Sequence, residues 1–459
     1  MKKILLAVVV VVLVALFGVQ YFVKSQISNN ISDTFAFADV KEKSKSSGFS
    51  STKGVIEGVI TAQNIKQNFV KSMRFVVPNL NEKESLELFE NEDFKDIKFE
   101  YEYEIKHGIL GIMSGYESNG KIRITSPEIE KELKEIFGTN EIATIKSNTN
   151  ATGDTKFNVK MTDIDKIIDG EKVKVQNFAI GGDLLGNGKR ANNISIKLDK
   201  LNIGDEKTQI SVDDIEAKTV FAEDLVIENT QNIMDLILRD SQSEGFVKNI
   251  KLGDENLSAT LNELKFSQTY TKNGENIADE ASYSLAKISS DELDVENFSL
   301  KQRVIYPVEM IENLLKIAYS GDANIEKQSE ILIENFMNSI QKQGFEANFD
   351  LKADVNKLED TIKNKTKING ELLIGFDKGI DFKNLNLFNL GTLLEKLNFG
   401  LKADITSKDI KELIGDNQDE LIKLNGETAS IDMKYDKTKS MITINGDEMS
   451  IEEFMQLFM

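Results

Sequence analysis

The chain of 459 residues has no cysteine, no tryptophan, one histidine and only three prolines. Without cysteine, neither a disulfide framework nor a thiolate zinc site can form. Because proline interrupts β-sheet hydrogen bonding, its scarcity allows long, uninterrupted strands. The formal net charge of −20 argues against a nucleic-acid partner, because binding phosphate needs a basic face. These absences leave an acidic protein whose stability does not depend on the redox state of its compartment.

The longest uncharged stretch, residues 4–23, lies between Lys3 and Lys24. As a helix it would be about 30 Å long, the thickness of one bilayer core. A cleaved signal peptide is the alternative, but bulky residues fill the positions where small residues precede a cleavage site. We therefore expect residues 1–24 to form a signal anchor. Because Lys2 and Lys3 precede the helix, we expect the N-terminus in the cytoplasm and the bulk of the chain across the membrane.

Alternation of apolar and charged residues dominates the rest of the chain. In Lys98–His107, Phe99, Tyr101 and Tyr103 alternate with glutamates, which is typical of a half-buried antiparallel strand. Similar short runs recur between residues 142 and 302 and again from 345 to 444, and several are separated by Asp-Gly or Asn-Gly dipeptides that favour hairpin turns. The pattern predicts an antiparallel meander.

Helices are few and well punctuated. Ser126, Pro127 and Gly138 are typical N-cap, first-turn and C-terminal residues, and they predict a helix over residues 127–137. Pro307 opens a helical insert, residues 307–343, expected as a hairpin laid on the sheet. The predicted fold is α+β and β-dominated: an anchor over 1–24, a mainly antiparallel region over 25–305, and the insert with the last strands and helix over 306–459. We expect the second and third parts to share one large sheet that can curve.

Candidate catalytic and ligand-binding residues are sparse. His107 could act as a general base or a metal ligand, or its ring could simply pack inward at the end of its strand. Gly181–Arg190 looks like a phosphate-binding loop, but Asp183 and Arg190 replace residues that such a loop requires, which favours a wide hairpin loop. Three aspartates between residues 163 and 169 lack the spacing of a calcium loop. The sequence predicts no enzyme activity, no cofactor and no metal.

The last residues, 441–459, are the most specific stretch. They predict a strand, a turn at Asn445-Gly446, and a helix opened by a capping box in which Ser450 and Glu453 satisfy each other's backbone N–H groups. Phe454 lies on the apolar side of this helix. We expect the chain end to dock on the rest of the protein.

This ending resembles the YdgA-like family of bacterial inner-membrane-anchored proteins, a domain of unknown function. Gly48-Phe49-Ser50-Ser51 and a strand that ends in His-Gly also match, although Ile109 stands where the family often has Pro. The resemblance implies a location in the bacterial inner membrane, with the bulk of the chain periplasmic, and no reaction. The plan is also similar to that of AsmA-like envelope proteins, whose long sheets curve into grooves thought to carry lipid. The positions that match family motifs are His107, Gly108, Asn445, Gly446, Ser450 and Phe454.

Two functions therefore stand as expectations. The first is binding of a lipid or other amphiphile in an apolar groove of the sheet, by a protein that contacts the membrane through residues 4–23. The second is a structural or scaffold module of the cell envelope, for example a homodimer. The two differ in whether the apolar faces of the strands close into one core or leave a groove open, because an open apolar surface implies a ligand or a partner.

Overall fold

The computed structural model describes residues 38–64, 96–108, 111–168, 170–186, 190–204, 208–226, 239–253, 258–291, 293–319, 325–357, 365–380, 382, 393–414 and 421–456. The anchor expected at residues 4–23 lies outside these residues, as does Ile109. The sequence also predicts a helix at 384–397, interrupted by Gly391, and most of it lies outside the described residues too. Among the helices within the described ranges, none is long and apolar enough to cross a membrane.

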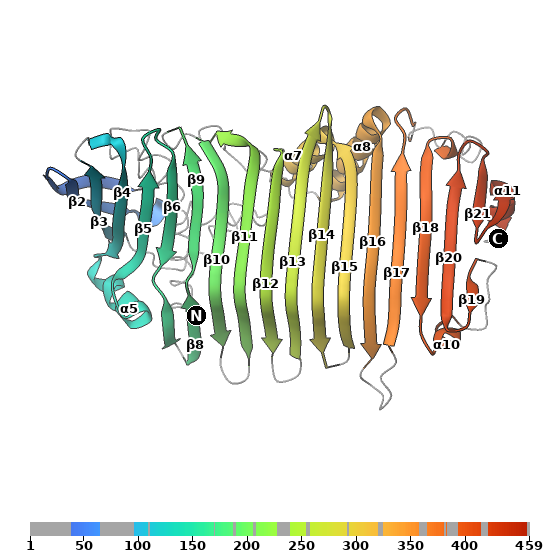
Figure 1. The fold of residues 1–459 in the computed structure, drawn as a ribbon, viewed down its shortest axis with the longest axis horizontal. Helices are drawn as coiled ribbons and strands as arrows, with labels where there is room; N and C mark the ends of the chain where they lie inside the picture. Colours follow the sequence, from blue (N-terminus) through green and yellow to red (C-terminus); the bar gives the residue numbers. More distant parts are fainter. Residues whose placement is uncertain are drawn as a thin grey trace. The chain divides into compact units, whose positions relative to one another are not determined.

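The chain divides into two compact units, residues 1–237 with 245–255 and residues 238–244 with 256–459. Strand β12 (Ser241–Gly253) contributes to both units, and the boundary expected near residue 305 falls inside the second. Both units consist mainly of antiparallel strands with few helices (Figure 1). The prediction of a β-dominated α+β fold is confirmed in the described residues.

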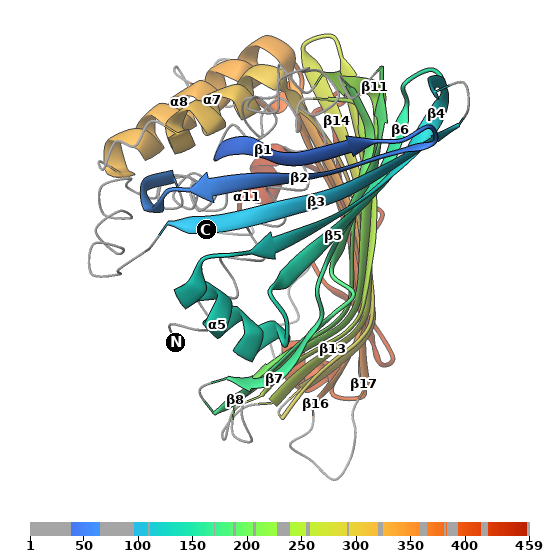
Figure 2. The same cartoon turned by 90° about the vertical axis from the view of Figure 1, so that its left-hand side faces the viewer.

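The first unit is a sheet with one helix against it. Strands β1 to β6 pair in chain order, the hairpin β7–β8 follows, β9 returns to pair with β6, and β10 pairs with β9, β8 and β11. Figure 2 shows helix α5 on the concave side of β3 to β5. The bounds are β1 Asp39–Ser47, β2 Ser51–Ile60, β3 Ile97–Gly108, β4 Gly111–Ile124, α5 Pro127–Phe137, β5 Glu141–Thr149, β6 Thr155–Met161, β7 Ile164–Ile168, β8 Glu171–Gln176, β9 Ala179–Leu185, β10 Arg190–Gly204 and β11 Gln209–Val226.

The concave face of this unit is a closed core. Phe99 and Tyr101 of β3 are each 1% exposed, and Leu133 and Ile136 of α5 are 0% and 1% exposed. These side chains belong to one large apolar cluster that takes residues from β2 to β11. The alternation of β3 and the apolar stripe of α5 were therefore both predicted correctly.

Helix α5 has the predicted bounds, and Ser126 is its N-cap residue as predicted, although its side chain makes no cap hydrogen bond. Gly138 ends the helix with a φ of 74°, and its N–H donates to the Lys134 carbonyl. The Ser126 hydroxyl instead donates to the Asp96 carbonyl over 3.2 Å and accepts the Lys98 N–H over 2.6 Å. This buried hydroxyl therefore joins the helix start to β3 instead of bonding to an N–H of the first turn.

Several stretches expected as turns or loops are strands. The dipeptide Asn119-Gly120, which is typical of a hairpin turn, lies inside β4. A Cβ added to Gly120 would come within 2.3 Å of the Tyr101 ring, and a Cβ added to Gly58 of β2 would come within 2.2 Å of the Phe99 ring. The small polar residues 44–51 are typical of a loop, but they form the end of β1 and a short turn in which the Gly48 N–H donates to the Ser51 carbonyl. Gly181 and Gly182, expected in a wide hairpin loop, lie in β9 instead. Strand glycines here make room for side chains or backbone of neighbouring strands.

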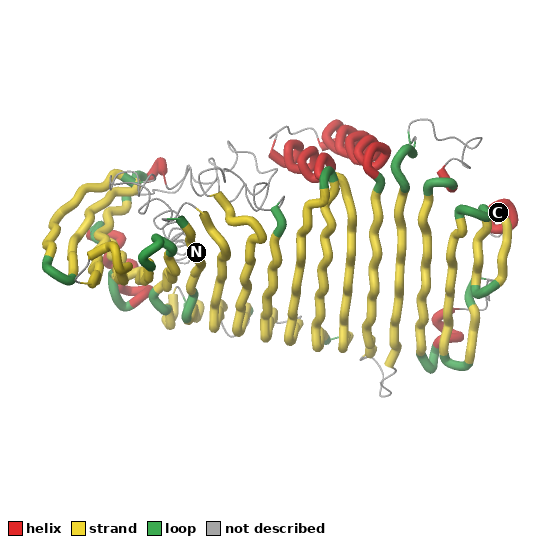
Figure 3. The backbone as a smooth tube through the Cα atoms, turned by 45° about the horizontal axis from the view of Figure 1, so that its top comes forward, coloured by secondary structure: helices red, strands yellow, loops and turns green. Residues whose placement is uncertain are grey.

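The second unit contains long strands and the helical insert, drawn in yellow and red in Figure 3. Strands β13 to β18 pair in chain order, β20 pairs with β18, β19 and β21, and β22 closes the series. The insert is a helical hairpin, as predicted. The bounds are β13 Ser258–Asn273, β14 Asn276–Ser290, β15 Leu293–Pro307, α7 Val308–Tyr319, α8 Ile325–Gln343, β16 Phe345–Lys357, β17 Lys365–Phe376, β18 Leu397–Thr406, α10 Ile410–Ile414, β19 Lys423–Asn425, β20 Thr428–Asp436, β21 Met441–Ile444, β22 Asp447–Ser450 and α11 Ile451–Gln456.

The C-terminal segment has one more strand than predicted. Asn445 and Gly446, with φ of 52° and 99°, make a two-residue turn after which β22 pairs with β21 before the helix begins. The predicted capping box is present: the Ser450 N–H donates to Glu453 Oε2 over 2.7 Å, and the Glu453 N–H donates to Ser450 Oγ over 3.2 Å. Phe454 packs on a cluster built from β20 and β21.

Candidate functional site

The inner face of the second unit is defined as the sheet face that carries α7 and α8. Phe336 of α8 meets Phe345 of β16 edge to face, with ring centroids 6.2 Å apart. Tyr306 at the end of β15 is buried with Val308 and packs with Met310 of α7. Figure 2 shows both helices along the concave side of these strands. The two helices therefore cover the inner-face side chains at the adjacent ends of these strands, among them Tyr306 and Phe345.

Below the helices, cross-strand register places inner-face side chains in three rows. The polar residues of these rows all lie on β13 to β15, where they alternate with apolar ones, and from β16 onward the rows contain no polar side chain. The first row is Tyr270, Asp279, Val304, Ala347, Ile374 and Phe399; the second is Gln268, Ala281, Gln302, Phe349, Leu372, Leu401 and Met433; the third is Phe266, Tyr283, Leu300, Leu351, Gly370, Ala403 and Ile431.

The apolar middle of these rows is not closed into a core. Phe349 and Leu351 of β16 and Leu372 and Ile374 of β17 are only partly buried, and none of them belongs to a core cluster of the described residues. In the first unit, by contrast, Tyr101 at the centre of the inner face is 1% exposed. The structure therefore leaves apolar surface accessible on the second unit.

A polar cluster lies at the β13–β14 end of the rows. Gln268 Nε2 donates to the Tyr270 hydroxyl over 2.5 Å and to Asp279 Oδ1 over 3.0 Å. Asp279 is 8% exposed, and burial raises the pKa of its carboxyl. Burial is the largest cause that raises the pKa of Tyr270 to about 12, and the nearby Asp279 charge is the second. The same two causes raise the pKa of Tyr306. The cluster thus joins a buried acid and two phenols, and burial raises the pKa of all three.

The chemistry open to this cluster is recognition of a polar group. Asp279 forms no ion pair with a lysine or arginine in the described part of the chain. Within the same residues, no three histidine or carboxylate side chains come together as a metal site. The cluster offers a carboxylate and phenols at the edge of an apolar surface.

Two hollows on the sheets contain many charged side chains. In the second unit, a trough of about 590 Å³ extends over β15 to β18 and β20, and its lining includes Arg303, Lys402, Phe349 and Leu372. Successive residues along these strands point to opposite faces of the sheet. The lining of the trough therefore includes charged residues and apolar residues that alternate along each strand. Asp350 Oδ1 in this lining is buried and has no hydrogen-bond partner among the described residues.

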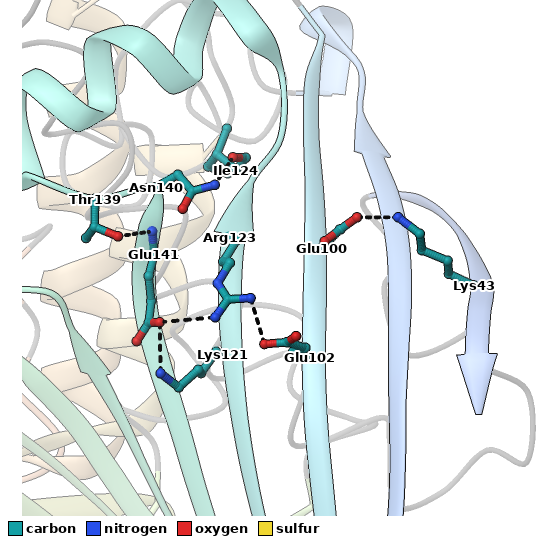
Figure 4. Close-up of polar contacts among 9 residues, drawn as sticks. All are labelled: Lys43, Glu100, Glu102, Lys121, Arg123, Ile124, Thr139, Asn140 and Glu141. Carbon is teal, nitrogen blue, oxygen red and sulfur yellow. Dashed lines mark hydrogen bonds and ion pairs between the residues drawn. The ribbon is translucent and has the colours of Figure 1, made fainter. Parts of the chain in front are cut away.

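The second hollow, of about 600 Å³, lies over β1 to β5 of the first unit. Its surroundings form a ladder of ion pairs, shown in Figure 4: Arg123 lies 2.7 Å from Glu102 and 3.8 Å from Glu141, and Lys121 lies 3.0 Å from Glu141. Nearby, Lys43 bonds to Glu100 over 2.6 Å. Because these charges compensate one another at the surface, the ladder has the features of a solvated face.

Comparison with known proteins assigns a family. A family model described as "Bacterial protein of unknown function (DUF945)" matches residues 1–304. The chain belongs to this family. The matched residues include Gln268, Tyr270 and Asp279, whereas the apolar strands β16 to β18 lie beyond the match. No curated protein and no solved structure matches the chain.

The family-motif positions selected from the sequence lie elsewhere. His107 and Gly108 end β3 in the first unit, where the His107 N–H donates to the Ser50 carbonyl over 2.9 Å and Gly108 pairs with Gly111. His107 Nδ1 is buried without a hydrogen-bond partner in the described residues. His107 therefore holds the β3 end to the start of β2.

The C-terminal motif joins the last strands of the second unit. The Asn445 N–H donates to the Asp432 carbonyl over 2.7 Å, and its Oδ1 accepts the Asp432 N–H over 2.9 Å. Its Nδ2 donates to the Leu421 carbonyl over 3.0 Å. Asn445, Gly446, Ser450 and Phe454 therefore position β20, β22 and α11, and none of them belongs to the polar cluster.

Sequence reasoning missed the cluster around Asp279. A signal was present in the alternation of β14, where Ile277, Ala281 and Leu285 are buried and Asp279 occupies an inward position among them. A carboxylate at an inward position of a strand costs free energy unless a polar partner compensates it, so a partner is expected near Asp279. The partner, Gln268, comes from the neighbouring strand and becomes evident only with the register.

Proposed function

We propose that this family member binds an amphiphile on the inner face of its second unit, with the apolar chain across β16 to β18. The observation that carries the proposal is the set of partly exposed apolar side chains Phe349, Leu351, Leu372 and Ile374, which lie outside every core cluster of the described residues. From β14 to β18 the rows extend about 19 Å, since neighbouring strands lie about 4.8 Å apart. This length suits a single fatty acyl chain.

The energetics favour an apolar ligand. Covering roughly 200 Å² of apolar surface would contribute about 5 kcal/mol, at about 25 cal/mol per Å². The adjacent polar cluster supplies the orientation that an apolar surface alone lacks, because small-molecule sites typically combine apolar walls with a few placed polar groups. No nucleophile–base pair accompanies the cluster among the described residues, which supports binding as the function.

We also propose that residues 4–23 anchor the protein in the bacterial inner membrane with the second unit in the periplasm, as in the YdgA-like proteins that residues 441–459 resemble. The uncharged stretch and the lysines before it support this location. Alkaline carbonate should leave the chain in the membrane fraction, and protease added to spheroplasts should digest it. Release by carbonate, or protection from protease, would contradict the proposal.

Photolabelling tests the binding site. Membranes that contain the full chain are irradiated with a photoactivatable fatty alcohol, and labelled peptides are mapped by mass spectrometry. We expect label on β16 to β18, and Leu372→Gln should lower it severalfold because it places a polar group on the inner face. Leu373→Gln, its neighbour on the opposite face, is the matched control and should leave labelling unchanged. Equal labelling of the two variants, or label only elsewhere, would reject the site.

The second candidate function, a homodimeric module of the envelope, has one observation in its favour. Ile331, Ile333 and Met337 of α8 are 42%, 54% and 38% exposed, and a second copy of the chain would cover them. Because the chain has no cysteine, Ile333→Cys introduces a single thiol. Oxidation in membranes should then produce a covalent dimer, whereas Lys342→Cys near the end of α8 serves as the control. If neither variant crosslinks, this face is not a dimer interface.

A further inference from the structure

We propose that the amphiphile carries an amine head group and that Asp279 receives it; this inference rests on the proposed function. The side chain of Asp279 lies in the first inner-face row, directly opposite Tyr270 on β13 and Val304 on β15. From Val304 the row continues through Ala347 to Ile374. An alkyl chain on β16 and β17 would therefore place its head at Asp279.

The carboxylate has an acceptor position to offer. Oδ1 of Asp279 accepts the Gln268 amide over 3.0 Å, and Oδ2 receives no hydrogen bond from any described residue. An ammonium group has three N–H donors and no acceptor, so it can bond to Oδ2 without competing with Gln268 for Oδ1. A carboxylate or phosphate head would instead place like charge beside a buried acid.

No lysine or arginine of the described residues forms an ion pair with Asp279. Lys301 and Arg303 of β15 alternate to the opposite face, where Arg303 pairs with Glu280 over 3.1 Å, and Lys287 of β14 pairs with Asp294 over 2.8 Å. Lys272 of β13 lies on the Asp279 face, opposite Ile277, and its side chain is exposed. Asp279 is thus a buried carboxylate without an ion-pair partner among the described residues. The neighbouring phenol rings of Tyr270 and Tyr306 add aromatic surface of the kind that attracts cations.

Burial of Asp279 agrees with this assignment. Asp279 is 8% exposed and lies near Tyr306, which belongs to a buried cluster with Ile277 and Val308. Its pKa is raised because burial disfavours the unpaired charge, and a bound ammonium would reverse this cost by pairing with it. The same low-dielectric surroundings that penalise the free carboxylate strengthen its bond to an ammonium.

Competition photolabelling tests the head group with the full chain in membranes. Dodecylamine, dodecanol and dodecanoate share one alkyl chain and differ in the head, and each competes with the photoactivatable fatty probe at β16 to β18. We expect dodecylamine to displace the probe at a concentration at least tenfold lower than dodecanol, and dodecanoate to be the weakest. In Asp279→Asn, the advantage of the amine should disappear while dodecanol competes as before.

A matched control separates binding at Asp279 from the general attraction of cations to a chain of net charge −20. Glu280→Gln changes the net charge equally at the next residue of β14, on the opposite face, and should keep the amine preference. If the three competitors act equally on the wild type, or if Asp279→Asn keeps the preference, the head-group assignment is wrong and the apolar site stands. If the probe does not label β16 to β18 at all, the proposed function itself fails. Thermal denaturation of both variants checks that each one folds.

Discussion

The ring of Tyr101 on β3 fills the space beside Gly120 on β4, so that a Cβ on Gly120 would lie 2.3 Å from the Tyr101 Cε2 atom. The phenylalanine two residues earlier meets Gly58 of β2 in the same way. A strand glycine gives up side-chain packing of its own, and here it admits an aromatic ring from the next strand. This pairing holds the inner face of the first unit closed.

Gly120→Ala should lower the free energy of unfolding by about 1–3 kcal/mol, because the added methyl group overpacks a core in which Tyr101 cannot move freely. Urea denaturation measures the change. Gly253→Ala is the control, since its Cβ would meet nothing within 4 Å, and it should leave stability nearly unchanged. Adding Tyr101→Leu to Gly120→Ala should cost less than the sum of the two single changes. Additive effects would show that the ring and the glycine do not interact.

Asp279→Asn should change how stability depends on pH. Burial raises the pKa of Asp279 above 3.8, so the folded state binds its proton more tightly than the unfolded state. Stability therefore falls as pH rises from 3.8 to the raised pKa, and the cost persists above it. The asparagine variant can still accept the Gln268 bond and lacks the charge. We expect its melting temperature to exceed that of the wild type at pH 7 and the difference to shrink near pH 4; a constant difference would contradict this account.

Asn445→Asp should destabilise the last strands of the second unit. The aspartate keeps an acceptor for the Asp432 N–H but loses the donor that Asn445 Nδ2 supplies to the Leu421 carbonyl over 3.0 Å. Losing one such bond costs about 1 kcal/mol. Asn445→Gly keeps the turn, whose φ of 52° suits glycine, and loses both side-chain bonds, so it should cost more. Hydrogen exchange at Asp432 reports the change locally, and equal exchange in all three proteins would refute it.

Ser450→Ala should weaken helix α11 and raise the pKa of Glu453. Hydrogen bonds to the Ser450 N–H and, to a smaller extent, to its hydroxyl lower the pKa of the Glu453 carboxyl below 4.5. The contact therefore stabilises the fold above pH 4.5, and this stabilisation is lost as pH falls through the lowered pKa. Replacing a capping serine by alanine costs about 1 kcal/mol. An NMR titration of Glu453 should show its pKa shift toward 4.5 in Ser450→Ala. Glu452→Gln, the neighbouring acid, should leave the Glu453 titration unaltered.

Period-two alternation predicted β3 and most later strands because one face of each is apolar, and cap residues predicted α5 and the insert. Alternation fails in the long strands of the second unit. Leu264 pairs with Leu285, and the next apolar pair is Leu261 with Ile288, three residues away instead of two or four. Glu263 lies between them with a φ of 54°, as Asn297 does on β15. A glutamate gives no sequence signal for left-handed backbone, so this shift could not be predicted.

The candidate site was beyond sequence reasoning for a related reason. Its polar cluster joins Gln268 and Asp279 from two strands, and its apolar surface joins Phe349 with Leu372 from two more. Which residues share a row depends on register, and a shift of one residue would send each side chain to the opposite face. The motifs that could be recognised, at Asn445 and Ser450, instead stabilise local structure.

The pairing order of the second unit has a consequence for how it folds and frays. From β13 to β18 each strand pairs with its neighbour in the chain, so contacts are local and strands can add one after another, as in a linear array. In such an array a local opening at one strand interface need not unfold the strands on either side. A ligand lying across β14 to β18 would tie five successive strands together and turn this series of local equilibria into one cooperative transition.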